Sequence, residues 1–158
     1  MPQRYPLESL LSVRHYREEE AARAVARAQS ALKAARVAER AKEKALIEWR
    51  AWREEEVRRR YEALMGRAVP VKRIFEFNQG LSELNARELD LAAVLEKARG
   101  EVKRCEAEAA RAKSAASLAR KNAAKIETHR SIWQQDAKRE AERQEDLEFE
   151  EFKAPRKE

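Results

Sequence analysis

Apolar residues recur at alternating steps of three and four from Ile74 to Leu147. Of the 22 positions in this series, 18 are apolar, well above the 43% apolar content of the whole chain. A step that averages 3.5 residues is the period of a helix whose apolar seam faces a partner in a left-handed coiled coil. We therefore predict one long helix over about 71–152. Its seam is Ile74, Phe77, Leu81, Leu84, Glu88, Leu91, Leu95, Ala98, Val102, Cys105, Ala109, Ala112, Ala116, Ala119, Ala123, Ile126, Arg130, Trp133, Ala137, Glu140, Gln144 and Leu147.

The first part of the chain carries the same step and predicts a second helix over about 6–65. Pro6 suits a first helical position, and Glu8 favours the positive end of a helix. Beyond Trp52 the apolar positions shift toward Val57, Tyr61 and Leu64, which predicts a local change of winding. The seam is Leu7, Leu10, Arg14, Arg17, Ala21, Ala24, Ala28, Ala31, Ala35, Ala38, Lys42, Ala45, Trp49 and Trp52, and Leu11, Val25, Leu32 and Leu46 widen it on one flank.

The strongest break between the two helices is Gly66 to Pro70. Glycine can adopt the left-handed conformation that closes a helix, and proline biases the residue before it away from helix. Two seams joined by this tip (66–70) predict an all-α fold, an antiparallel coiled-coil hairpin that forms a single elongated domain over 1–158. The second helix is longer, so we expect a C-terminal overhang from near Ser131 and a frayed tail at 153–158.

Composition supports long helices. The chain has 30 alanines, three glycines, four prolines and 41% charged residues, which is typical of coiled coils and argues against a thick globular core. The net charge of +6 comes from acids and bases that alternate along the chain, as in Arg53-Glu54-Glu55-Glu56-Val57-Arg58-Arg59-Arg60. This pattern favours a solvated helix surface with i,i+4 pairs over a nucleic-acid-binding patch.

The sequence offers little for catalysis or metal binding. His15 and His129 are the two histidines; we expect them at the surface of different helices, without the further ligands that a metal or an acid–base site needs. Phosphate loops, nucleophile elbows and HExxH motifs are absent from the sequence. We expect no enzyme activity and no cofactor or metal.

The single cysteine and the terminal sequences bear on location. Cys105 falls on the predicted seam, so we expect a small core residue in a reducing compartment. No signal peptide and no run of 18 apolar residues is present. We expect a soluble, intracellular protein without direct membrane insertion.

Two groups of apolar side chains are candidates for binding. The overhang carries Ile132, Trp133, Leu147, Phe149 and Phe152, which indicates a binding surface, with a frayed end or self-association as the alternatives. Near the tip, bulky aromatic residues fit equally well as core and as interface residues. They are Trp49, Trp52, Tyr61, Phe75 and Phe77.

Two stretches carry a family resemblance: Tyr5-Pro6-Leu7-Glu8-Ser9-Leu10-Leu11-Ser12-Val13-Arg14 and Glu48-Trp49-Arg50-Ala51-Trp52-Arg53-Glu54-Glu55-Glu56. With the hairpin length, they resemble the YscO (SctO) family of type III secretion proteins and, more distantly, the flagellar export protein FliJ. The resemblance implies a non-enzymatic coiled-coil stalk, similar to the γ stalk of rotary ATPases. Its paired ends would enter the hexameric export ATPase, and its tip would approach the cytoplasmic ring of the export-gate protein.

The resemblance also implies where partners bind. The ring end would comprise Leu7, Leu10, Leu11, Arg14, Trp133 and Leu147. At the tip end, Phe77 and Leu81 match the gate-facing aromatic and leucine of the flagellar relative, and Trp49 and Trp52, spaced by three rather than four, correspond approximately to its paired tyrosines; Tyr61 and Phe75 lie nearby. Some relatives bind secretion chaperones or the needle-length regulator. The implied protein is a cytoplasmic monomer, peripheral to the inner-membrane secretion apparatus. The alternatives are a structural coiled coil that self-associates and a basic coiled coil that binds nucleic acid.

Overall fold

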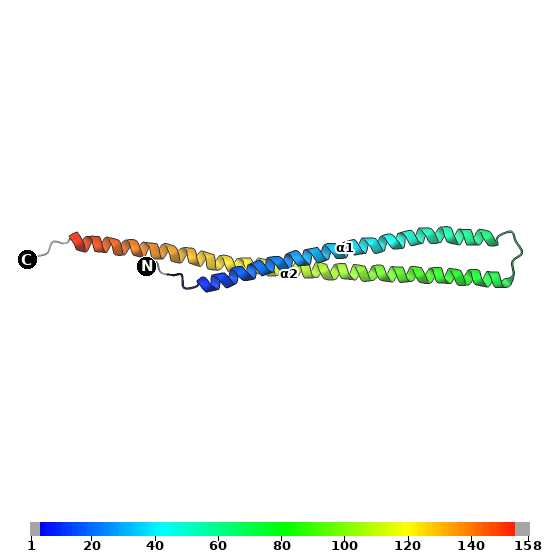
Figure 1. Ribbon diagram of the computed structural model, residues 1–158, viewed down its shortest axis with the longest axis horizontal. Coiled ribbons are helices and arrows are strands. Elements are labelled where there is room, and N and C mark those ends of the chain that lie inside the picture. The colour runs from blue at the N-terminus through cyan, green and yellow to red at the C-terminus, as the bar shows by residue number, and fades with distance from the viewer. Residues whose placement is uncertain (1–3, 154–158) are drawn as a thin grey trace, which may run out of the picture. The chain divides into compact units, whose positions relative to one another are not determined.

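The computed structural model describes residues 4–153 and contains two helices, α1 (Glu8–Leu64) and α2 (Val71–Lys153) (Figure 1). Within these residues there is no strand. The helix pair confirms the predicted all-α hairpin, and the observed bounds lie within a few residues of those expected. Of the predicted frayed tail, 153–158, all residues after Lys153 lie outside the described residues.

The helices divide into two compact units, and each is described by itself. The turn unit is Arg27–Ala110 and contains the connection between the helices. The terminal unit combines the chain up to Ala26 with the chain from Arg111 onward. The expectation of one elongated domain over 1–158 stays a prediction.

The connection between the helices follows from its glycine and its proline. Gly66 has a φ of 72°, the left-handed conformation that closes a helix after its last turn. The carbonyl of Pro70 accepts a hydrogen bond from the amide of Arg73 at 2.9 Å, so Pro70 stands immediately before the first turn of α2. Proline lacks an amide hydrogen, which a helix would leave unpaired near this position in any case.

In the turn unit, the second part of α1 and the first part of α2 lie side by side (Figure 1). Ion pairs connect Arg36 with Glu106, Arg99 with Glu39 and Glu88 with Arg53. The two residue numbers in each of these pairs sum to about 140, which is the signature of an antiparallel pair in one constant register. The core of this unit includes Ala35, Val102 and Cys105, with Leu32 packed against them.

The terminal unit pairs the beginning of α1 with the later part of α2. Here His15 contacts Glu127 at 2.9 Å, and Glu18 and Glu8 contact Arg120 and Arg130. These residue numbers again sum to about 140. Leu11 and Ala123 are the most deeply buried apolar residues of this unit, at 3% and 2% exposed.

The predicted seam of α2 is confirmed over most of its length. Every position of the series from Phe77 to Ala137 is buried or half-buried, and Cys105 is a core residue at 3% exposed. From Lys138 to Lys153 every residue is exposed, so the overhang begins a few residues later than the expected Ser131. In Figure 1 this end of α2 extends past the beginning of α1 within the terminal unit.

The predicted seam of α1 is wrong along one of its two lines, where every position from Leu10 to Trp52 except Ala24 is exposed. The residues that face α2 are Leu11, Val25, Leu32 and Leu46, which the pattern placed on the flank, whereas Leu10, Ala31, Ala38, Ala45 and Trp52 are exposed. The predicted shift beyond Trp52 is found in part. Arg53, Glu56 and Arg60 continue the earlier step, whereas Val57 and Leu64 are half-buried as predicted and Tyr61 is exposed. Leucine, isoleucine and valine bury more apolar area than alanine, so the stripe with the larger side chains faces inward.

Substitutions at Gly66 in the turn and at Gly100 in α2 test whether the turn requires a glycine. Gly66→Ala should destabilise the fold by about 1 kcal/mol, because alanine at positive φ is strained. Gly100 lies in the interior of α2, and a Cβ added there would have no atom within 4 Å; Gly100→Ala should therefore stabilise the fold by about 0.5–1 kcal/mol. Urea unfolding followed by circular dichroism measures both. Equal shifts for the two variants would contradict this interpretation.

Candidate partner-binding surfaces

The beginning of the chain packs onto α2 in the terminal unit. Tyr5 is 6% exposed, and its ring lies 5.7 Å from the ring of His129 and 5.5 Å from that of Trp133, measured between centroids. A 2.7 Å hydrogen bond joins the Tyr5 hydroxyl to Nδ1 of His129. Trp133 is therefore half-buried beneath Tyr5 instead of lying open on the overhang. Tyr5 lies before the periodic region of the first helix, so the apolar pattern assigned it no face.

The remaining predicted ring-end residues have different environments. Leu7 and Leu10 are partly exposed, at 36% and 37%, and Leu147 is 60% exposed. Leu11 is buried in the helix pair, and Arg14 is half-buried. The structure thus brings Leu11, Arg14 and Trp133 into the packed part of the terminal unit and leaves Leu147 on the overhang.

The overhang forms a surface that we call the terminal segment, residues 138–153 of α2. Leu147, Phe149 and Phe152 are 60%, 69% and 93% exposed. Phe149 and Phe152 line a shallow groove together with Glu145 and Glu148. Residues 145–152 carry five acidic side chains and no basic one, in a chain whose net charge is +6. The terminal segment is therefore both apolar and acidic.

The predicted tip-end residues divide between core and surface. Phe77 and Leu81 of α2 are half-buried, as is Trp49 of α1. Trp52, Tyr61 and Phe75 are 47%, 53% and 70% exposed, and we call these three the turn-side aromatic surface. Trp52 lies against Trp49, with ring centroids 4.8 Å apart.

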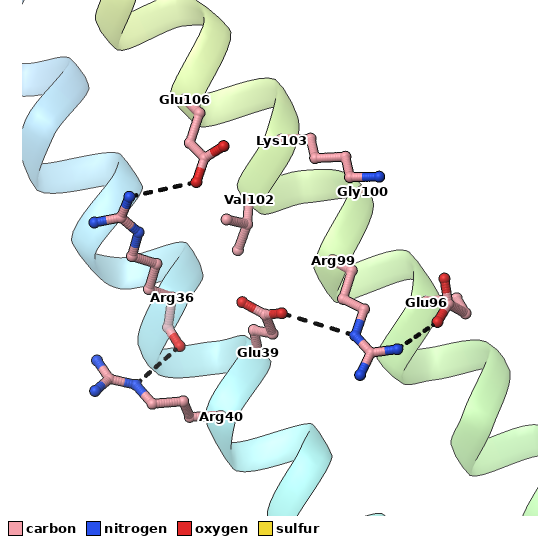
Figure 2. Close-up of a pocket in the computed structure, with 9 residues that line it drawn as sticks. All are labelled: Arg36, Glu39, Arg40, Glu96, Arg99, Gly100, Val102, Lys103 and Glu106. Atoms are coloured by element: carbon pink, nitrogen blue, oxygen red, sulfur yellow. Dashed lines mark hydrogen bonds and ion pairs between the residues drawn. The ribbon is translucent and has the colours of Figure 1, made fainter.

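Between the two helices of the turn unit lies an open groove with mixed charge (Figure 2). Figure 2 shows Arg36 of α1 facing Glu106 of α2, and Arg99 of α2 facing Glu39 of α1. Hydrogen bonding by Glu96 raises the pKa of Arg99, with smaller contributions from Glu43 and Glu39. Since its charges are already paired across the helices, this groove resembles a coiled-coil flank more than a ligand site.

A second charged group lies closer to the turn, and it combines Glu88, a position of the predicted seam of α2, with residues of the 53–60 run that were predicted to be solvated. Glu88 accepts hydrogen bonds from Arg50 Nε at 2.8 Å and from Arg53 Nη1 at 2.6 Å. Hydrogen bonding by Arg50, followed by the charges of both arginines, lowers the pKa of Glu88. Glu56 is 9% exposed and contacts Arg59 and Arg60, and these hydrogen bonds lower its pKa as well. Arg53 and Arg60 are half-buried.

The Cys105 thiol is buried in the helix pair. Burial raises the pKa of the Cys105 thiol, and the nearby charge of Glu101 adds to this effect. Among the residues that the structure describes, no three His, Cys, Asp or Glu side chains are placed to hold a metal ion. Neither described helix has a stretch that is apolar and long enough to cross a membrane.

The fold and these surfaces define a two-helix coiled-coil protein with exposed apolar side chains near its turn and at the end of α2. Residues 7–155 match the model of the YscO family, described as type III secretion protein YscO. The chain belongs to this family and is a type III secretion protein, which confirms the resemblance seen in the sequence.

A solved structure of CT670 from Chlamydia trachomatis, described as a YscO homolog, has the same fold. It superposes with a TM-score of 0.80 at 23% sequence identity, over 95% of this chain and 92% of CT670. A search among curated proteins found no match. The likeness to CT670 shows that the two-helix fold is shared.

Removing Tyr5 should expose Trp133. In a background with Trp49 and Trp52 replaced by phenylalanine, Tyr5→Ala should move the fluorescence emission of Trp133 to longer wavelength and cost about 3 kcal/mol of stability. Tyr5→Phe, which removes the hydroxyl alone, should cost about 1 kcal/mol. Tyr16→Ala is the control, because Tyr16 is 62% exposed. An unchanged emission in Tyr5→Ala would show that Tyr5 does not cover Trp133.

The lowered pKa of Glu88 predicts a pH dependence. The ordinary value is 4.5, so the stabilisation by charged Glu88 is complete above this pH and is lost as the pH falls through the lower folded value. Glu88→Gln should reduce stability at neutral pH and should lessen the loss of stability that the parent shows as the pH falls below 4.5. Urea midpoints at several pH values measure this, with the exposed Glu83→Gln as control. A decline as steep as in the parent would contradict the prediction.

Proposed function

We propose that this protein is a non-enzymatic stalk that couples the hexameric export ATPase to the cytoplasmic ring of the export gate in a type III secretion system. The paired beginning of α1 and end of α2 would engage the ATPase, and the turn would approach the gate. Membership of the YscO family supports the secretion role. The observation that supports placing the ATPase contact at the end of α2 is the exposure of every residue in the terminal segment.

The chemistry of the terminal segment indicates the kind of surface that it binds. Phe149 and Phe152 would need apolar slots, since exposed phenylalanines at a helix end gain most from burial in a partner. The five acidic residues around them would be costly to bury unless they met basic groups. The proposed ATPase surface is therefore basic, with apolar slots for two phenylalanine rings.

The turn-side aromatic surface is the proposed contact with the export gate. Trp52, Tyr61 and Phe75 are exposed aromatic residues of the types enriched in interfaces. Phe77 and Leu81, which match the gate-facing residues of the flagellar relative, are half-buried and would act by supporting this surface. We propose the same turn unit as the site that meets chaperones and the needle-length regulator, on the cytoplasmic side of the inner membrane.

Binding to the purified cognate ATPase tests the proposal. The double variant Phe149→Ser/Phe152→Ser and a chain that ends at Arg143 should each bind at least about tenfold more weakly than the parent. Leu89→Ser is the matched control, because Leu89 is equally exposed, at 71%, but lies in the turn unit. Raising the salt concentration should weaken parent binding, because the proposed contact pairs opposite charges.

Three outcomes would overturn parts of the proposal. If the parent does not bind the ATPase, the stalk function is wrong. If both terminal variants bind as tightly as the parent, the ATPase contacts another part of the chain. If sedimentation shows concentration-dependent dimers that the double variant abolishes, the terminal segment serves self-association.

A further inference from the structure

The two helices contribute unequally to their interface near the turn. From α2, the inner positions are mostly apolar, and Leu84 is buried at 7% exposed. From α1, the inner positions beyond Trp49 include the charged Arg53, Glu56 and Arg60, beside the half-buried Val57 and Leu64. Glu56 is the one charged side chain that is buried among the described residues. Charges at inner positions of a coiled coil weaken packing, and their best-attested use is to specify register.

A group of four side chains, which we call the polar clamp, joins the helices here: Arg50 and Arg53 of α1 with Asn85 and Glu88 of α2. Arg50 Nε donates to one Glu88 oxygen at 2.8 Å, and Arg53 Nη1 donates to the other at 2.6 Å. Arg53 Nη2 donates to Oδ1 of Asn85 at 2.5 Å. Both oxygens of Glu88 are therefore engaged, and its side chain is 22% exposed. Arg53 can reach both partners at once because its guanidinium is a rigid fork.

A second contact closer to the turn depends on the same register. A Cβ added to Gly80 of α2 would lie 2.7 Å from Nη1 of Arg60, so the missing side chain leaves space for the guanidinium of Arg60. Glu56 holds Arg60 from within α1, with 2.9 Å between Glu56 Oε1 and Arg60 Nε. A slide of either helix would place a residue with a side chain opposite Arg60.

The rest of the turn unit discriminates poorly between registers. Many of its inner positions repeat small or aliphatic side chains every seven residues, as in Ala28 and Ala35 of α1 and in Leu84, Leu91 and Ala98 of α2, and only Glu39 and Trp49 interrupt this repeat on α1. A slide by one heptad would bring similar residues together there. The first residues of α2, 71–76, are all exposed, so few contacts near the turn oppose it. At the clamp, however, such a slide would place Arg53 opposite Leu81 or Leu95 and leave Glu88 without its partners.

We propose that the polar clamp, together with Arg60 seated over Gly80, selects one register of the helix pair near the turn. By doing so it determines which residues of α2 lie opposite the inward-facing Trp49. Without the clamp, the turn unit populates a second register one heptad away. This inference concerns the hairpin itself and does not depend on the proposed function.

A distance measurement by pulsed electron paramagnetic resonance tests the proposal in the full chain. Spin labels on Ala38→Cys and Lys103→Cys, with Cys105→Ala to leave no other thiol, sit level with each other on exposed positions of the turn unit. The parent should give one narrow distance. A heptad slide displaces one helix by about 10 Å along the other, so a second register appears as a longer distance.

Removing the clamp with Arg53→Leu/Glu88→Leu should retain helix content and thermal stability, because leucines pack well, but should give two distances. The triple variant Arg50→Glu/Arg53→Glu/Glu88→Arg restores opposite charges and should return one distance. Arg36→Leu/Glu106→Leu removes an exposed ion pair of the same unit and should keep one distance. Arg53→Lys keeps the charge without the fork, so it should show the second distance at a lower fraction.

One narrow, parent-like distance in Arg53→Leu/Glu88→Leu would overturn the proposal. If that variant does not fold, one distance in Arg53→Lys would overturn it equally. Two distances in the Arg36→Leu/Glu106→Leu control would also contradict it, because register would then depend on any cross-helix ion pair.

Discussion

Cross-helix pairing of charges is the constraint on which the rest of this structure depends. Helix α1 has a broad apolar stripe, and two neighbouring lines of residues could each serve as its inner face. Ion pairs from Glu39 to Arg99 and from Arg53 to Glu88 hold one of these lines against α2. Packing alone discriminates weakly, since much of the interface consists of alanine, which buries little area. The charges therefore act together with the larger apolar side chains of α1, such as Leu32 and Leu46, to set which face of this helix is hidden.

This explains how far the sequence predicted the fold. The bounds of both helices follow from Gly66, Pro70 and the apolar period, and the seam of α2 is correct because its large apolar residues lie on a single line. The seam of α1 failed at alternate positions, since alanines mark one line and Leu11, Val25, Leu32 and Leu46 mark the next. A count of apolar residues weighs alanine and leucine alike, whereas burial does not.

The candidate surfaces were predictable in part. The exposed residues of the terminal segment follow from helix lengths, because α2 is longer than its partner. The cover that Tyr5 provides for Trp133 was not predictable, because a residue outside the periodic region has no assigned face. The polar clamp was missed in part for a related reason: alternating charges near Arg53 look solvated in the sequence, and only the fold shows that Arg53 lies toward the partner helix and pairs with Glu88, a position of the predicted seam.

The alanine-rich interface has a consequence for how such proteins diverge. Positions such as Ala35, Ala109 and Ala123, all less than 9% exposed, require a small side chain, while most outward positions require only solubility. A fold that is specified by the size of its buried side chains and by their spacing tolerates many substitutions. Its sequence can therefore change while the fold is retained. A TM-score of 0.80 at 23% identity with CT670 is what this freedom produces. For coiled coils of this kind, two chains can share a fold although few of their residues are identical.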